Sequence, residues 1–255
     1  MDTFDKETNV LIIGGGFSGM ATAVALQKEG INDFHIIDRG HDFGGTWRDN
    51  SYPGAACDVP SHLYSLSFAQ DFDWSRSFGT QPEIYEYQRE VARNHGLYSS
   101  AHFKTEMVDA RWDDDAARWV VVTEDIDSGA RTTWAAKELV LGVGALCEPR
   151  MPDIQGIETF AGEVFHSSRW NHEVDLRDKR VAIIGTGASA IQIIPKIAPI
   201  VAHLDVYQRT APYVIPRLDR KYTNIERTAL RKLPGLRRVV RAQDWFFREL
   251  QIPGL

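Results

Sequence analysis

The sequence predicts an α/β protein in which one unit, a strand followed by a glycine-rich turn, a helix and a second strand, occurs twice. The first copy begins with the apolar run 9–13 and the turn Gly14–Gly19, and the second with 180–184 and the turn Gly185–Ala190. A short apolar run that ends in glycine is typical of a buried parallel strand. The third observation is a group of alternating strands between the two copies.

In the first copy, residues 18–29 predict a helix that ends at Gly30, and residues 33–38 predict the second strand. The chain between the copies predicts a β-meander, because Asp-rich and Asp-Ser-Gly turns join three strand patterns, at 105–112, 117–124 and 131–141. The second copy continues with a predicted helix at 188–198 and a strand at 203–208. Two further helices are predicted at 224–232 and 236–249.

Composition argues against nucleic-acid-binding, membrane-binding and disulfide-rich exported proteins. The net charge of −6 gives no reason to expect a nucleic-acid or membrane partner. Cys57 and Cys147 are the only cysteines, which is too few for a disulfide framework, and the polar start lacks the features of an export signal. We therefore expect a cytoplasmic protein, with no metal site.

The first turn, with its flanking elements, predicts a dinucleotide site. Gly14 permits the tight turn, Gly16 lets the backbone approach a pyrophosphate, and Gly19 lets the helix pack closely on the strand. The start of the helix offers backbone N–H groups to the phosphates. Asp38 ends the second strand, where its carboxylate can accept hydrogen bonds from ribose hydroxyls and repel a 2′-phosphate. We assign FAD to this turn.

The second turn has the same pattern but a different residue after its second strand. Its sequence is Gly-Thr-Gly-Ala-Ser-Ala, and Arg209 stands nineteen residues after Ala190, the spacing that separates Asp38 from Gly19. A guanidinium suits a phosphate dianion both by charge and by bidentate geometry. We therefore assign NADP(H), not NAD(H), to the second turn.

Two further segments carry a resemblance to a known family. The first matches [A/G]-G-x-W-x-x-x-x-[F/Y]-P-[G/M]-x-x-x-D, at Gly44, Gly45, Trp47, Tyr52, Pro53, Gly54 and Asp58. The second matches F-x-G-x-x-x-H-x-x-x-W, at Phe160, Gly162, His166 and Trp170. Over essentially its whole length the chain resembles the class B flavoprotein monooxygenases, the Baeyer–Villiger monooxygenases. Asn171 departs from the Pro or Asp that usually follows, whereas Trp170 differs from the Tyr or Phe typical of N-oxidising relatives.

The resemblance implies an enzyme in which NADPH reduces FAD, O2 adds at the flavin C4a position, and the peroxyflavin inserts one oxygen atom into a ketone to give an ester or lactone. The protein then supplies position, charge and exclusion of water. Two alternatives stay open: an N- or S-oxidising flavin monooxygenase acting on an amine or sulfide, and a non-catalytic dinucleotide-binding remnant. A disulfide reductase would need paired redox cysteines, which Cys57 and Cys147 do not provide.

The resemblance also implies roles for single residues. Asp58 is expected beside the isoalloxazine, and His166 is expected to link the two domains instead of acting as a catalytic base. The predicted cofactor-binding residues are Gly14, Gly16, Phe17, Ser18, Gly19, Asp38, Gly45, Thr46, Trp47, Asp58, Tyr64, Val108, Gly185, Thr186, Gly187, Ala188, Ser189, Ala190, Gln192, Arg209 and Thr210.

These assignments predict two Rossmann-like domains. Residues 1–150 form the FAD-binding domain with its meander, 151–179 a linker, and 180–255 the NADP-binding domain with the start of a helical insert. In the family, a stabilising arginine and the return to the FAD-domain sheet come later in the chain. We therefore expect a C-terminal half of the same protein as a partner and no oxygenation by residues 1–255 alone. The aromatic cluster 245–247 is expected to be exposed.

Overall fold

The computed structural model describes residues 4–145, 147–233 and 235–250, so the terminal Leu255 lies outside the described residues. The chain forms two compact units, Met1–Asp49 with Tyr85–Glu148, and Asn50–Ile84 with Pro149–Leu255. The strands are β1 (Lys6–Ile13), β2 (Phe34–Ile37), β3 (Ala101–His102), β4 (Thr105–Asp113), β5 (Arg118–Asp125), β6 (Arg131–Leu141), β7 (Arg180–Ile184) and β8 (His203–Tyr207). The helices are α1 (Phe17–Lys28), α2 (Thr46–Asp49), α3 (Gln81–Asn94), α4 (Ala188–Ile197), α5 (Asn224–Lys232) and α6 (Leu236–Glu249), with short 3₁₀ helices η1 (Leu97–Ser100), η2 (Ile157–Thr159) and η3 (Ser167–Arg169).

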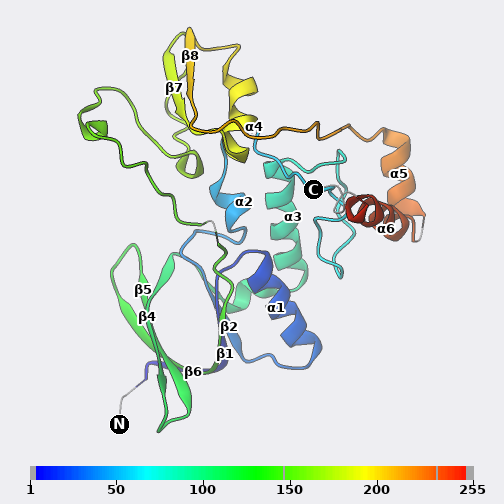
Figure 1. Ribbon diagram of the computed structural model, residues 1–255. Helices are drawn as coiled ribbons and strands as arrows, with labels where there is room; N and C mark the ends of the chain where they lie inside the picture. Colours follow the sequence, from blue (N-terminus) through cyan, green and yellow to red (C-terminus); the bar gives the residue numbers. More distant parts are fainter. Residues whose placement is uncertain (1–3, 146, 234, 251–255) are drawn as a thin grey trace. The chain divides into compact units, whose positions relative to one another are not determined.

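The first unit is built on one mixed sheet with strand order β3-β2-β1-β6-β5-β4 (Figure 1). β1 pairs in parallel with both β2 and β6, so that Val10 lies between Phe34 and Glu138. β4, β5 and β6 form the predicted antiparallel meander, which is confirmed. β6 pairs with β1 along one edge and with β5 along the other, so the meander is continuous with the parallel strands.

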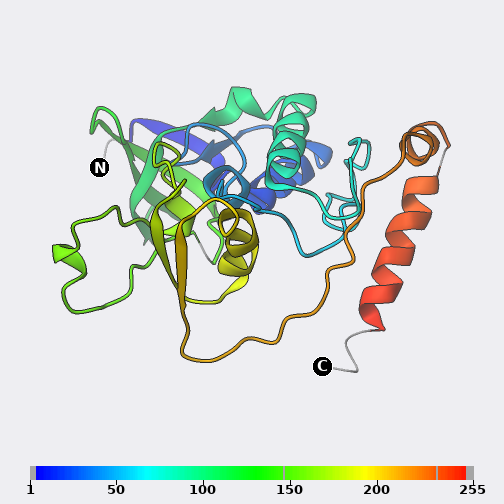
Figure 2. The same cartoon turned by 90° about the horizontal axis from the view of Figure 1, so that it is seen from above.

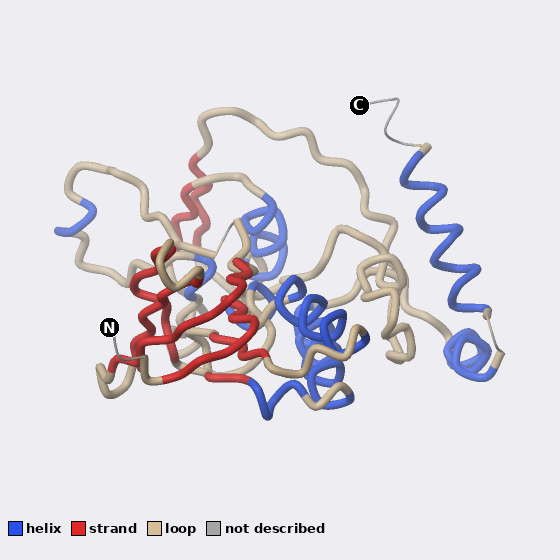
Figure 3. Tube along the Cα trace, turned by 90° about the horizontal axis from the view of Figure 1, so that it is seen from below, coloured by secondary structure: helices blue, strands red, loops and turns tan. Residues whose placement is uncertain are grey.

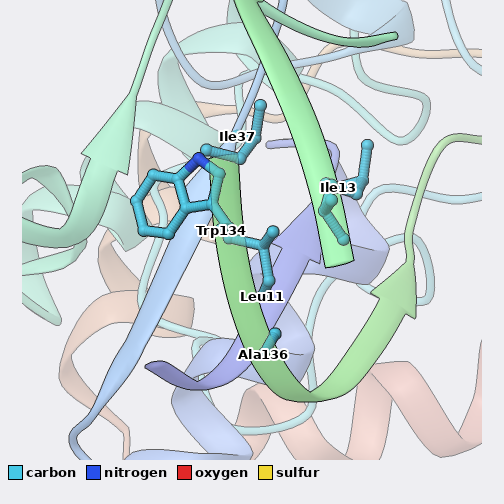
Figure 4. Close-up of a cluster of buried hydrophobic side chains, with 6 residues drawn as sticks. Leu11, Ile13, Ile37, Trp134 and Ala136 are labelled. Atoms are coloured by element: carbon cyan, nitrogen blue, oxygen red, sulfur yellow. The ribbon is translucent and has the colours of Figure 1, made fainter. Parts of the chain in front are cut away.

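The core of the first unit lies where the parallel strands meet the meander. Its buried side chains, drawn in Figure 4, are Leu11, Ile13, Ile37, Val121, Trp134 and Ala136. The indole N–H of Trp134 donates a hydrogen bond to Thr123 Oγ1 at 3.0 Å, which satisfies the polar edge of this buried ring. Successive residues of a strand point to opposite faces, so Ile12 faces away from Leu11, and a Cβ on Gly19 of α1 would lie 3.3 Å from Ile12 Cγ2.

Helix α3 and strand β3 were not predicted from the sequence. The N–H and hydroxyl of Thr80, directly before α3, both donate to Glu83 Oε2. The buried residues of α3 recur at helical spacing and are Ile84, Tyr87, Gln88, Val91 and Ala92. The signal was therefore present as a helix-start residue followed by a stripe of mainly apolar residues at helical spacing. β3 is two residues long and pairs with β2 at Ile36 and Ile37, which is too short a pattern to detect.

In the second unit, β7 and β8 pair in parallel, and α4 connects them (Figure 2). After β8, residues 208–220 contain no helix or strand, and they lead to α5 and α6 (Figure 3). Both helices have the predicted bounds. Thr223 and Glu226 form a reciprocal capping box that explains where α5 begins.

Helix α6 is held by the guanidinium groups of Arg237, Arg241 and Arg248, and it exposes aromatic rings elsewhere. Arg241 Nη1 donates to the backbone carbonyl oxygens of His62, Leu63 and Ser65 at 2.7–3.1 Å. The exposed residues are 54–55% accessible to solvent, as expected from the sequence, and are Trp245, Phe246 and Phe247.

Candidate functional site

The first glycine turn is built by backbone packing that side chains would prevent. Gly14 has a φ of +108°, and a Cβ there would lie 2.5 Å from the carbonyl oxygen of Gly142. A Cβ on Gly19 would lie 1.8 Å from the carbonyl oxygen of Gly14. The N–H of Gly14 donates to Ile37 O at 2.7 Å, which joins the turn to the end of β2. Glycine is therefore required at 14 and 19 for the tight turn and the close helix, as the spacing predicts.

Gly16 and Gly45 face each other across the start of α1. Gly16 is the N-cap residue of α1 and makes no side-chain cap hydrogen bond. A Cβ on Gly16 would approach nothing closer than Gly45 Cα, at 3.8 Å, while Gly45 has a φ of +49°. Phe17 and Ser18 begin α1, and Thr46 and Trp47 begin α2 directly after Gly45. This leaves bare backbone beside a helix N-terminus, an arrangement that fits the pyrophosphate of a dinucleotide.

Asp38 is buried and already has three donors. Its Oδ2 accepts from the N–H of Gly15 at 2.6 Å, and its Oδ1 accepts from the N–H of Gly40 and from Arg48 Nη1, each at 2.7 Å. A carboxylate offers about four lone-pair positions, so roughly one is left. Asp38 thus braces the turn itself, and it retains capacity for a single ribose hydroxyl.

Arg48 is a residue of this site that sequence reasoning missed. Its side chain is 5% exposed and pairs with Asp38 and Asp49, both at 2.7 Å, while Nη1 also donates to Asp42 O at 2.6 Å. Burial opposes its charge, yet the hydrogen bonds and charges of Asp49 and Asp38 raise the pKa of Arg48 above its ordinary value. Arg48 lies one residue after Trp47, and nothing in its spacing identifies Asp38 as its partner. Gly142, beside the turn, was also missed, although it follows an apolar strand.

Three further residues predicted to bind a cofactor, Asp58, Tyr64 and Val108, are distributed over both units. Val108 is 46% exposed at a register shift in β4, the outermost strand of the meander. Asp58 is exposed, and its backbone carbonyl accepts from Arg248 Nη2 at 3.2 Å. Tyr64 is half-buried in a turn closed by its N–H to Pro60 O at 2.8 Å. Within the first unit, the structure brings Gly14, Gly16, Gly19, Asp38 and Gly45 together, whereas Asp58 and Tyr64 belong to the second unit.

The second glycine turn repeats the geometry of the first. Gly185 has a φ of +104°, and its N–H donates to Tyr207 O at 2.8 Å, as that of Gly14 does to Ile37. Gly187 is the N-cap residue of α4, and a Cβ on it would have no atom within 4 Å. Thr186 lies between the two glycines, Ala188 and Ser189 begin α4, and Ala190 is buried. The open space at Gly187 fits a second phosphate group.

The hydrogen bonding aligns Gln208, not Arg209, with Asp38. Ile37 and Tyr207 occupy equivalent positions because each carbonyl accepts from the first glycine of its turn. The residues that follow them are Asp38 and Gln208. The stretch from the first glycine of the turn to this position is therefore one residue shorter in the second copy than in the first. Arg209 and Thr210 come next and are exposed. An amide followed by a guanidinium therefore replaces the carboxylate at this position.

The side chain of Gln192 contacts the chain itself. Its Oε1 accepts from the hydroxyl of Tyr52 at 3.0 Å and from the N–H of Ala56 at 3.3 Å, and its Nε2 donates to Ala56 O at 2.8 Å. Gln192 is one of the predicted cofactor-binding residues. The structure assigns three of its hydrogen bonds to the segment before Asp58.

His166 acts as a local cap. Its Nδ1 accepts from the N–H of Ser168 at 3.2 Å and lies 2.9 Å from Ser168 Oγ, at the start of η3. Trp170 packs edge-on against Phe165, with ring centroids 5.1 Å apart, and Phe160 is 62% exposed. These contacts are local and order the segment around η3. Among them, none gives His166 a partner suited to base catalysis.

Within the described parts of the chain, no three His, Cys, Asp or Glu residues gather as metal ligands. The helices described at 4–145, 147–233 and 235–250 include none with the length and apolar character needed to cross a bilayer.

Comparison with known proteins places these features in a family. Residues 7–228 match the model of the flavin-binding monooxygenase-like family. A Baeyer–Villiger monooxygenase of Streptomyces coelicolor is 47% identical over 247 residues, covering 97% of this chain and 46% of the relative. The chain thus spans about half the length of that relative.

Solved structures agree. The cyclohexanone monooxygenase from Rhodococcus sp. Phi1 bound to NADP+ is 36% identical, with a TM-score of 0.81 over 89% of this chain and 42% of its own. The OTEMO complex with FAD and NADP is 33% identical, with a TM-score of 0.81 over 88% of this chain and 43% of its own. The two glycine turns, the sheet that carries the first of them and the family match lead to one conclusion: the chain belongs to the flavin-binding monooxygenase-like family.

Proposed function

We propose that this chain supplies the nucleotide-binding part of an NADPH-dependent flavin monooxygenase that inserts one oxygen atom of O2 into a ketone. The observation that carries the proposal is the pair of geometrically equivalent turns that differ in the residue after the second strand. In the first copy this residue is Asp38, after β2, and in the second copy Gln208 and then Arg209 come after β8. A protein that holds two different dinucleotides needs this kind of difference.

FAD is proposed for the turn at Gly14–Gly19. The bare backbone of Gly16 and Gly45 accommodates the pyrophosphate, and the remaining acceptor position of Asp38 suits a ribose hydroxyl. Thr46, Trp47, Asp58, Tyr64 and Val108 complete the set proposed for flavin. Residues 1–150 are proposed as the flavin-binding domain.

NADP(H) is proposed for the turn at Gly185–Ala190, in a domain of residues 180–255 joined to the first by 151–179. The start of α4 points its N–H groups at the turn, where a pyrophosphate is stabilised. Arg209 and Thr210 are exposed directly beyond β8, where a 2′-phosphate attached to the adenosine ribose would meet a guanidinium.

When bound, the reduced flavin supplies the activation of O2. The chain's own contribution is to orient the cofactors and limit the access of water. Asp58 is proposed to orient a cationic group beside the flavin, and His166 to order the connection between the two domains. The proposed substrate of the whole protein is a small ketone, with a sulfide or amine as alternative. The two free thiols, Cys57 and Cys147, support the cytoplasm as its location.

Binding by the purified chain tests the cofactor assignment. We expect yellow protein with one FAD per chain, and tighter binding of NADP+ than of NAD+. In Arg209→Gln, the affinity for NADP+ should fall about 10- to 150-fold, as for loss of a hydrogen bond to a charged group, with little change for NAD+. Arg238→Gln, at an exposed position of α6, is the matched control and should behave as the parent.

Equal affinities of the parent for NADP+ and NAD+ would contradict the assignment of Arg209, and absence of bound flavin would contradict that of the first turn. Oxygenation by the whole protein is measured with cyclohexanone, the ketone for which the Rhodococcus relative is named. We expect the lactone to carry one oxygen atom from isotopically labelled O2. A lactone that gains label only when the water is labelled, and not when O2 is, would contradict the proposal.

A further inference from the structure

The amide of Gln192 is used almost completely inside the second unit. An amide side chain has two donor positions and two acceptor positions. In Gln192 both acceptor positions and one donor position are occupied, by the hydroxyl of Tyr52 and by the N–H and C=O of Ala56. One N–H is left for any ligand, so most of the hydrogen-bonding capacity of this side chain is used within the protein.

The contact has the pattern of a strand pairing. Ala56 offers one backbone donor and one backbone acceptor, and Gln192 meets both of them. Gly54 lies against the same turn of the helix, because a Cβ there would be 2.6 Å from Gln192 O, and its φ is +85°. The segment 52–56 is therefore fitted to α4 by both hydrogen bonding and backbone approach.

A second attachment holds the start of this segment. Ser51 Oγ lies 2.8 Å from His172 Nε2, six residues beyond His166. At the C-terminal end of the segment, the backbone carbonyl of Cys57 accepts a hydrogen bond from Arg217 Nη1 at 3.0 Å. The segment is thus held at both ends and at its centre, and Asp58 follows it immediately.

We propose that Gln192 is a positioning residue that couples the two cofactor sites, by making the segment that carries Asp58 follow any displacement of α4. The inference rests on the proposed function, in which α4 begins at the NADP(H) turn and Asp58 serves the flavin. Gln192 lies four residues after Ala188, one helical turn from the N-terminus that receives the pyrophosphate. A nucleotide that shifts this turn shifts Ala56 with it, and the coupling acts equally in both directions.

The coupling is measured as a ratio of affinities. The dissociation constant of NADP+ is determined by calorimetry with and without saturating FAD, and the change in the visible flavin spectrum on adding NADP+ is recorded. In the parent chain we expect FAD to change the affinity for NADP+ roughly tenfold, in the usual range of coupling between sites. Gln192→Met, which keeps the length of the side chain, should bring the ratio close to one and remove the spectral response.

Two further variants separate positioning from other roles. Gln243→Met makes the same chemical change at an exposed position of α6, and it should keep the parent ratio. Tyr52→Phe removes only one acceptor contact of Gln192, and it should give an intermediate ratio even where Gln192→Met folds poorly. Folding is checked by thermal unfolding of each variant.

Several outcomes would overturn the inference. If Gln192→Met weakens NADP+ binding by the same factor with and without FAD, the ratio of the two affinities is unchanged. Gln192 would then be a direct ligand of NADP+. A parent ratio of one would show that there is no coupling to transmit. If the parent binds neither cofactor, the proposed function itself fails, which is a different result from binding of both without coupling.

Discussion

Arg48 and Asp38 form an ion pair of 2.7 Å in which the side chains are only 5% and 7% exposed. The pair joins α2, which follows Gly44 and Gly45, to the end of β2. Because Asp38 also accepts from the N–H of Gly15, the charge of Arg48 stabilises the carboxylate that braces the first glycine turn. Local backbone geometry at the proposed flavin site thus depends on one buried arginine.

Replacement of Arg48 is expected to destabilise the first unit strongly. Arg48→Met leaves the Asp38 carboxylate buried without its cation, and breaking such a pair costs about 3 kcal/mol. Urea unfolding followed by tryptophan fluorescence measures the loss. Arg131→Met is the control, since the Arg131–Glu124 pair lies in water with side chains 67% and 34% exposed. Equal losses in the two variants would show that the buried pair has no special weight.

Two alanine substitutions separate folding from binding. Gly19→Ala places a Cβ 1.8 Å from a backbone oxygen, so α1 must move, and we expect a loss of roughly 1–3 kcal/mol in the free energy of unfolding. In Gly187→Ala the new Cβ meets no atom within 4 Å, so stability should persist while NADP+ binding weakens, because the methyl group occupies phosphate space. Denaturation curves and NADP+ titrations of both variants check this. A stable Gly19→Ala chain with unaltered FAD affinity would contradict the packing argument.

Stability should fall between pH 6.5 and pH 4 because of His62. His62 is 2% exposed, and both of its ring nitrogens lack a partner among the described residues. Arg237, Arg241 and the ring of Tyr222 face it. Burial, with the charges of Arg237 and Arg241, lowers the pKa of His62 to about 4. The unfolded chain takes up a proton near pH 6.5 and the folded chain only near pH 4, so acid favours unfolding in this interval, by up to roughly 3 kcal/mol.

The variant His62→Phe tests this assignment. We expect it to reduce the slope of stability against pH between 6.5 and 4 and to be more stable than the parent near pH 5, measured by urea unfolding at each pH. Some slope should remain, because burial also lowers the pKa of His102 to about 4. The same slope in parent and variant would exclude His62 as its source.

The two cysteines should react differently with alkylating reagents. Burial raises the pKa of Cys57 to about 11, so at pH 8 only about one thiol in a thousand is in the reactive thiolate form. Cys147 is partly exposed. Iodoacetamide at pH 8 followed by peptide mass spectrometry should find label on Cys147 alone in the folded chain and on both residues in urea. Rapid labelling of Cys57 in the folded chain would show that its segment opens readily.

Sequence patterns predicted most of the regular structure because they report local properties. The strands of the meander, the two helices after Pro216 and both glycine turns lie where apolar runs, alternation and capping residues place them. α3 was missed although Thr80 and Glu83 signalled its start, since the sequence around it is rich in polar and aromatic residues. Tyr64, Val108 and Asp58 were proposed from resemblance, and their roles stay predictions.

The partners of the site residues could not be predicted in the same way. Arg48 is ten residues from Asp38, and Gln192 is 136 residues from Ala56, and no periodicity relates either pair. The alignment of Gln208 with Asp38 likewise depends on which carbonyl accepts from Gly185, a long-range hydrogen bond.

By itself, the sequence determined the two copies of the dinucleotide-binding unit, the need for glycine at 14 and 19, and the contrast between an acid and an arginine after the second strands. These follow from backbone sterics and from the charge of single residues, which act over a few positions. Only the tertiary structure decided that Asp38 braces its own turn with the help of Arg48, and that Gln192 holds the segment before Asp58. Such contacts form between residues distant in the chain, so they depend on how the strands and helices pack.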